Sequence, residues 1–218
     1  MKKAFILAGF TSMLLACNNN SNTGADNRDS LNHTGHNEKS SDTKNKDQVN
    51  AVKETMEKMM QKMHTMKITG NNDIDFAVMM IEHHKGAVEM SKVEIAKGTD
   101  AELKAFAQKV IDDQTKEITF MEEAISKAPK TTSSNSADFQ KALSNSMMAM
   151  MNDATVIYND IDKDFAAQMI PHHQSAVDMA KAYFDYGRET SLKTLCRNII
   201  NSQTKQINWL TEWLTKSK

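Results

Sequence analysis

The stretch of sequence that decides the fold spans residues 73–92 and reads DIDFAVMMIEHHKGAVEMSK. It returns 89 residues later, at 162–181, as DKDFAAQMIPHHQSAVDMAK, with twelve of twenty positions identical. Similarity at a fixed offset over this length is the signature of an internal repeat. We therefore predict a duplicated helical bundle domain at 47–218, with repeat one at 47–127 and repeat two at 138–216.

Each repeat has the pattern of three helices. Glycine (7 residues) and proline (2) are scarce, which favours long helices over turn-rich β folds. The first helices, at about 47–67 and 138–157, are rich in methionine. The second helices are expected to begin at Asp73 and Asp162, which serve as N-caps. They should stop before Gly98 and Gly187, because glycine favours a helix end. The third run over 100–127 and 189–216.

A capping box of Thr99 and Glu102 is expected to start the third helix of repeat one. The long second and third helices of each repeat should pair as antiparallel hairpins. Two such hairpins make a four-helix bundle, so the sequence predicts an all-α fold with additional Met-rich helices.

Composition excludes several classes of protein. The formal charge is −1 and no block of basic residues occurs, so we expect no nucleic-acid partner. The chain lacks a run of eighteen apolar residues, which argues against a permanent membrane span. Neither a nucleophile–base arrangement nor a phosphate-binding loop appears, so hydrolytic and kinase-like chemistry has no support.

The N-terminus has the pattern of an exported protein. Lys2 and Lys3 precede a short apolar stretch that ends at Cys17, so residues 1–16 read as a signal peptide. The ending resembles a bacterial lipobox, in which the cysteine carries the lipid. Residues 17–46 are polar and predict a disordered tether. We expect a lipoprotein of the bacterial cell envelope, held at a membrane through Cys17 and facing the periplasm or the cell exterior.

The paired histidines lie on the apolar side of their predicted helices. One face of the second helix carries apolar residues and a histidine at spacings of four and three residues: Phe76, Met80, His83, Ala87 and Met90. His84 lies on the adjoining face, and His172 and His173 repeat the arrangement. Four buried neutral imidazoles are costly unless each donor and acceptor finds a partner. We therefore predict a metal site here rather than four satisfied core histidines.

The neighbouring residues indicate which metal. Carboxylate-bridged di-iron bundles place a Glu three residues before each ligand His. Here that position holds Met80 before His83 and Met169 before His172, and Met90 and Met179 follow seven residues after these histidines. Thioether and imidazole ligands suit soft Cu(I), whereas zinc prefers Cys, His and carboxylate. Copper is the predicted metal, with silver as a mimic.

Further methionines surround this pattern. They are core filler, because Met packs irregular cores well, or accessory copper ligands. The accessory candidates are Met56, Met59, Met60, Met63 and His64 in repeat one, and Met147, Met150 and Met151 in repeat two. Cys196 lies among Leu195, Ile199 and Ile200, which predicts a buried structural thiol.

The motif Asp-Phe-Ala…Met-Ile-x-His-His-x-x-Ala-Val-x-Met, followed by Gln-x-x-Glu/Gln-Ile, resembles the domain-of-unknown-function family 305. The match covers about 73–126 and 162–214. The resemblance implies a ferritin-like helical fold, export, and association with copper binding or resistance. By position it implies motif residues at Met80, His83, His84 and Met90 and at Met169, His172, His173 and Met179.

The two copies depart from the family pattern in different places. Gln114 and Glu117 match the family's Gln and Glu, whereas the second copy has Gln203 and Gln206. The family usually has Pro before the His pair, which Pro171 matches and Glu82 does not. The two halves are therefore expected to be inequivalent.

The leading hypothesis is a copper-binding protein of the cell envelope that sequesters Cu(I) or delivers it to a partner protein. One alternative is a metal-dependent oxidoreductase on the same bundle. Another is a structural or interaction bundle with no metal, whose Met surface binds another protein.

Overall fold

The computed structural model describes residues 42–148, 150–151 and 156–217. These residues belong to one compact unit, Lys39–Lys218. Its six helices are α1 (Asp42–His64), α2 (Asn72–Lys97), α3 (Ala101–Lys127), α4 (Ser136–Ser146), α5 (Ile161–Tyr186) and α6 (Thr190–Lys216). The described part of the chain contains no strand, so the predicted all-α fold is confirmed.

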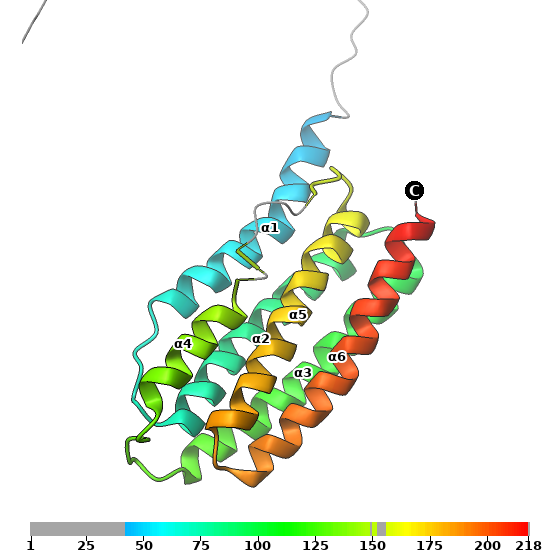
Figure 1. The fold of residues 1–218 in the computed structure, drawn as a ribbon. Coiled ribbons are helices and arrows are strands. Elements are labelled where there is room, and N and C mark those ends of the chain that lie inside the picture. Colours follow the sequence, from blue (N-terminus) through cyan, green and yellow to red (C-terminus); the bar gives the residue numbers. More distant parts are fainter. Residues whose placement is uncertain (1–41, 149, 152–155, 218) are drawn as a thin grey trace, which may run out of the picture. The chain divides into compact units, whose positions relative to one another are not determined.

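α2 and α5 lie at the centre of the bundle, with α3 and α6 on one side and α1 and α4 on the other (Figure 1). α2 packs along α3, and α5 packs along α6, as the predicted hairpins require. The hairpins meet mainly through α2 and α5, whereas α3 and α6 touch less. α1 and α4 cover the opposite side of the central pair. That this arrangement of helices is ferritin-like stays a prediction.

α2 and α5 run antiparallel, and each end of the pair is tied by an aspartate. Asp73 at the start of α2 accepts hydrogen bonds from the Tyr183 hydroxyl and the Arg188 amide at the end of α5. Asp162 at the start of α5 accepts from the Thr99 amide and hydroxyl, just beyond α2. Equivalent positions of the two repeats thus make equivalent contacts.

These contacts explain why the predicted N-caps were wrong. The side chains that cap α2, α3 and α5 belong to Asn71, Asp100 and Asp160, each of which accepts from amides of the first turn. Asp73 and Asp162 lie inside their helices, and their carboxylates reach the opposite repeat instead. Asp100 replaces the expected Thr99–Glu102 capping box, because the Thr99 hydroxyl is bonded to Asp162.

The glycines at the ends of α2 and α5 are required for space rather than for backbone conformation. Gly98 has φ −65° and Gly187 has φ −80°, so neither adopts the left-handed conformation that often ends a helix. A Cβ at Gly98 would lie 2.3 Å from the Glu94 carboxylate, and one at Gly187 would lie 2.2 Å from the Tyr183 ring. The two glycines leave room for the side chain four residues before them.

The first helix of each repeat differs from its predicted bounds. α1 includes residues 42–46, which were predicted to belong to the tether. α4 ends at Ser146 instead of continuing to 157. Residues 144–146 are Ser-Asn-Ser, which favour local hydrogen bonds over the helix, and the Ser146 hydroxyl donates to the Leu143 carbonyl at 2.6 Å.

The core runs along the central pair of helices. Its fully buried large side chains include Phe76, Met80 and Met90 from α2 and Phe165, Met169 and Met179 from α5. Among the described helices, none combines the length and the apolar character that a membrane-spanning segment requires.

Candidate metal site

The four paired histidines lie together at the middle of α2 and α5. The ring centroids of His83 and His172 are 3.8 Å apart, and all four imidazoles are fully buried. His84 and His173 flank this central pair, with centroids 6.3 Å from His83 and 6.0 Å from His172. In two antiparallel helices related by the repeat, only residues near the midpoints meet their own equivalents, and the histidines occupy those midpoints.

Most of the ring nitrogens in this cluster are unsatisfied. Of eight ring nitrogens, six find no hydrogen-bond partner within the described part of the chain. The exceptions are His172 Nε2, which lies 3.1 Å from the His83 carbonyl oxygen, and His84 Nε2. An unpartnered buried polar atom costs about 1–3 kcal/mol, so these nitrogens need an explanation.

Burial keeps His83, His172 and His173 neutral. Burial, followed by the proximity of the other histidines, lowers the pKa of His83 and of His172 well below the usual range. Burial and His84 lower the pKa of His173 to about 3. A neutral imidazole has a free lone pair on one ring nitrogen, which is the form that binds a metal.

One histidine has a carboxylate partner that the other repeat lacks. His84 Nε2 lies 2.7 Å from Glu117 Oε2 on α3. The residue equivalent to Glu117 is Gln206 on α6, and neither ring nitrogen of His173 has a partner in the described residues. The predicted inequivalence of the halves is therefore visible at this point. Sequence reasoning matched Glu117 to a motif without assigning its contact with His84.

The four motif methionines are fully buried on the same two helices as the histidines. Met80 and Met169 lie one turn before His83 and His172, and Met90 and Met179 lie two turns after them. Within the described residues, no group of three or more His, Cys, Asp or Glu side chains is placed to hold a metal ion.

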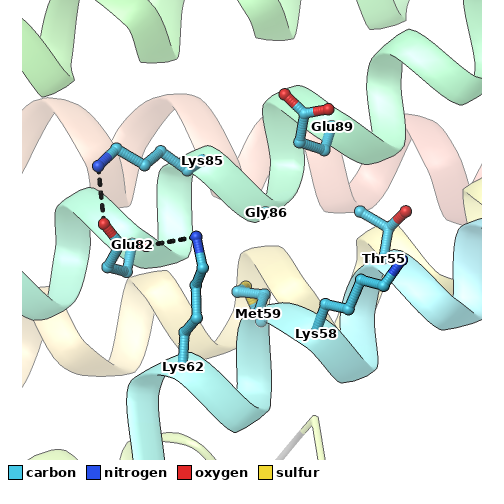
Figure 2. Close-up of a pocket in the computed structure, with 8 residues that line it drawn as sticks. All are labelled: Thr55, Lys58, Met59, Lys62, Glu82, Lys85, Gly86 and Glu89. Atoms are coloured by element: carbon cyan, nitrogen blue, oxygen red, sulfur yellow. Dashed lines mark hydrogen bonds and ion pairs between the residues drawn. The ribbon is translucent and has the colours of Figure 1, made fainter. Parts of the chain in front are cut away.

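The accessory methionines of α1 pack in or against the core, whereas His64 does not. Met56, Met59 and Met63 are buried, Met60 is partly buried, and His64 is exposed at the helix end. Figure 2 shows Met59 next to Gly86 of α2, in a pocket with three lysines on its rim. A Cβ at Gly86 would lie 2.3 Å from the Met59 sulfur, so Gly86 lets α1 approach α2 closely.

The accessory candidates of repeat two do not lie on a Met-rich helix as predicted. Met147 is the C-cap of α4, and Met150 and Met151 lie in the turns that follow. Met147 is buried and Met150 is partly buried, whereas Met151 is exposed.

Of the two cysteines, only Cys196 lies within the described residues. Cys17, the predicted lipidation site, lies outside the described residues. Cys196 is a free, fully buried thiol, as predicted, and burial raises its pKa to about 12.

Several solved structures resemble this chain. CopM in its Cu(I)-bound form is 31% identical, with a TM-score of 0.50, and the match covers 66% of this chain and 96% of CopM. CopM in its Cu(II)-bound form is 28% identical, with a TM-score of 0.51, and the match covers 67% of this chain and 97% of CopM. CopM in an Ag-bound form is also 28% identical, with a TM-score of 0.50, and the match covers 66% of this chain and 95% of CopM. A DUF305 protein from Streptomyces coelicolor shares the fold at 24% identity and a TM-score of 0.56, covering 68% of this chain and 95% of its own.

No curated protein sequence matches the chain. The family model described as domain of unknown function DUF305 matches residues 27–125 and 73–214, which together span most of the chain. The two matched regions both include α2 and, between them, the four clustered histidines. The chain therefore belongs to the DUF305 family.

Proposed function

We propose that this protein binds copper in the bacterial cell envelope, holding Cu(I) between α2 and α5 with imidazole and thioether ligands. The observation that carries the proposal is the cluster of four buried histidines, six of whose ring nitrogens find no hydrogen-bond partner in the described residues. A bound ion would take the lone pair of each imidazole that it binds, which satisfies one nitrogen of that ring and offsets part of the cost of burying the cluster.

The chemistry of the surrounding side chains favours a soft ion. The candidate ligands are His83, His84, His172 and His173, with Met80, Met90, Met169 and Met179. Thioethers bind Cu(I) well and bind zinc or hard cations poorly, and a thioether is not lost to protonation. The depressed pKa values of three of the histidines keep their lone pairs available for a metal at neutral pH.

The solved relatives support the same class of ligand. CopM, at 28–31% identity, is known in Cu(I)-bound, Cu(II)-bound and Ag-bound forms. Copper binding is therefore compatible with this fold in a relative whose length the chain covers almost completely. The preference for Cu(I) in this protein rests on its own methionine and histidine pairs.

The sequence supports a place for this activity outside the cytoplasm. We propose that residues 1–16 direct export and that Cys17 carries a lipid that holds the protein at a membrane. A protein anchored there would sequester copper that enters the envelope or pass it to a partner protein.

An anaerobic competition titration tests the proposal. Cu(I) is partitioned between the protein and a colorimetric chelator, for the wild type and for the double variant His83→Gln/His172→Gln. We expect the variant to lose at least one bound ion or at least tenfold in affinity, since it removes the two central imidazoles.

The matched control is His33→Gln/His36→Gln, which removes two histidines outside the cluster and should leave affinity and stoichiometry unchanged. Circular dichroism and thermal unfolding check that each variant is folded. Equal Cu(I) binding by wild type and cluster variant, or a wild type that prefers Zn²⁺ or Fe²⁺ to Cu(I), would contradict the proposal.

A further inference from the structure

A pocket lined by polar residues lies on the α3/α6 side of the bundle, and one of these residues contacts the histidine cluster. Its volume is about 240 Å³. It is lined by Asp113, Gln114, Lys116 and Glu117 from α3 and by Asn198, Ser202, Gln203 and Gln206 from α6. Glu117 is the residue that belongs to both regions, because it lines the pocket and its Oε2 lies 2.7 Å from His84 Nε2.

Glu117 links the solvent-exposed pocket to the buried cluster. The side chain of Glu117 is 18% exposed, whereas that of His84 is fully buried. The carboxylate therefore stands between the open pocket and an imidazole that solvent does not touch.

The pocket lies on the same symmetry axis as the central histidines. Its lining includes three pairs related by the repeat offset, namely Asp113 and Ser202, Gln114 and Gln203, and Glu117 and Gln206. His83 and His172, with centroids 3.8 Å apart, are another such pair. Equivalent residues that lie together must lie near the axis of the duplication, so the pocket and the cluster share it.

The wall of the pocket offers oxygen atoms to a cation. Gln114 and Gln203 are 3% and 2% exposed, and the amide oxygen of each has no hydrogen-bond partner in the described structure. Unpartnered carbonyl oxygens can replace part of the water around a cation as it leaves solvent. Of the charged lining residues, Asp113 is paired with Lys109 at 2.6 Å and Lys116 is exposed, which leaves Glu117 as the carboxylate at the inner end.

The pocket on the other side of α2 is less suited to a cation. Figure 2 shows Lys58, Lys62 and Lys85 around it, with Glu82 bonded to Lys85 and paired with Lys62. Three ammonium groups against two carboxylates repel a positive ion.

We propose that the pocket between α3 and α6 is the access route for the copper ion and that Glu117 passes the ion from this pocket to His84. The inference rests on the proposed function, since it concerns how Cu(I) reaches the cluster. Only one repeat carries the carboxylate, so the ion first meets the histidine of repeat one.

Stopped-flow measurements of Cu(I) loading and release under anaerobic conditions test this route. Ser202→Trp places an indole in the pocket without touching a candidate ligand. We expect loading and release to slow by the same factor, about tenfold or more, with an unchanged equilibrium Kd, because an obstacle on the route changes both rates equally. The matched control, Asn201→Trp, adds an indole at an exposed position outside the pocket and should bind at the wild-type rate.

Glu117→Gln tests the relay and keeps the proposal open to refutation if Ser202→Trp does not fold. We expect loading to slow by about tenfold and its dependence on ionic strength to weaken, because the attracting charge is gone. Glu122→Gln removes an equal charge from an exposed position of α3 and should change neither.

Wild-type loading rates in Ser202→Trp would overturn the route, and a weaker Kd with an unchanged loading rate in Glu117→Gln would show that Glu117 only positions His84. Failure of the proposed function is distinguishable, because the wild type would then bind no Cu(I) at equilibrium.

Discussion

Glu94 should make the stability of this protein fall as pH rises. Its carboxyl is fully buried at the end of α2, beside Asp162. Burial, then a hydrogen bond with Asp162 and the charge of that residue, raises the pKa of Glu94 to about 9. Burial alone would raise the pKa of Asp162, but hydrogen bonds from Thr99, Asp100 and Glu94 lower it. At neutral pH Glu94 is therefore neutral beside the ionised Asp162.

The sign and size of the effect follow from proton linkage. An unfolded glutamate titrates near 4.5, and Glu94 in the folded protein titrates near 9. Between these values the folded state binds one more proton than the unfolded state, so the free energy of unfolding decreases by up to about 1.4 kcal/mol per pH unit. Solvent screening at the end of the bundle reduces this limit.

Glu94→Gln removes the titration but keeps a donor for Asp162, because the amide N–H can replace the carboxyl O–H. We expect the variant to be about 1–2 kcal/mol more stable than the wild type at pH 8 and to show little advantage at pH 4.5. Urea unfolding followed by circular dichroism, in steps from pH 4.5 to pH 9, measures the difference. Glu89→Gln, on an exposed position of the same helix, is the control. Parallel stability curves for wild type and Glu94→Gln would refute the reasoning.

The equivalent end of the bundle predicts two further stability effects. Tyr183→Phe removes the hydroxyl that donates to Asp73, and urea unfolding should show a loss of about 1.5–3 kcal/mol, as for a hydrogen bond to a charged group; no loss would contradict the tie between the ends of α2 and α5. Gly187→Ala should lower the thermal midpoint, with an overpacking cost of about 1–3 kcal/mol, because the new Cβ would lie 2.2 Å from the Tyr183 ring; an unchanged midpoint would refute the steric account. In a Cys17→Ser background, Cys196 should not react with a thiol reagent until urea unfolds the protein, because its thiol is buried with a pKa of about 12. Rapid reaction of the folded protein would contradict that burial.

The repeated motif was sufficient to predict the elements that build the candidate site. Periodicity placed His83 and His172 on buried faces, and the 89-residue offset showed that both repeats carry the same histidine pair. Both follow from local spacing and symmetry, which a sequence displays directly. The structure adds that the meeting point is the middle of two antiparallel helices.

The contacts that sequence reasoning missed join residues far apart in the chain. Asp73 is an acceptable N-cap by local rules, yet its carboxylate bonds to Tyr183, 110 residues away. The partner of Asp162 is Thr99, 63 residues away, which removed the expected capping box. Glu117 contacts His84 from the neighbouring helix, a pairing that depends on the rotation of α3 against α2. The local sequence pattern does not determine any of these tertiary contacts.

X-ray absorption at the copper edge, on the Cu(I)-loaded protein, tests the central claim most directly. If the ion lies between α2 and α5, the spectrum contains both imidazole nitrogen and sulfur scatterers, and the sulfur contribution persists in Cys196→Ser because Met thioethers supply it. A spectrum without imidazole scattering, or one whose sulfur contribution disappears in Cys196→Ser, would contradict a Cu(I) site built from the paired histidines and methionines.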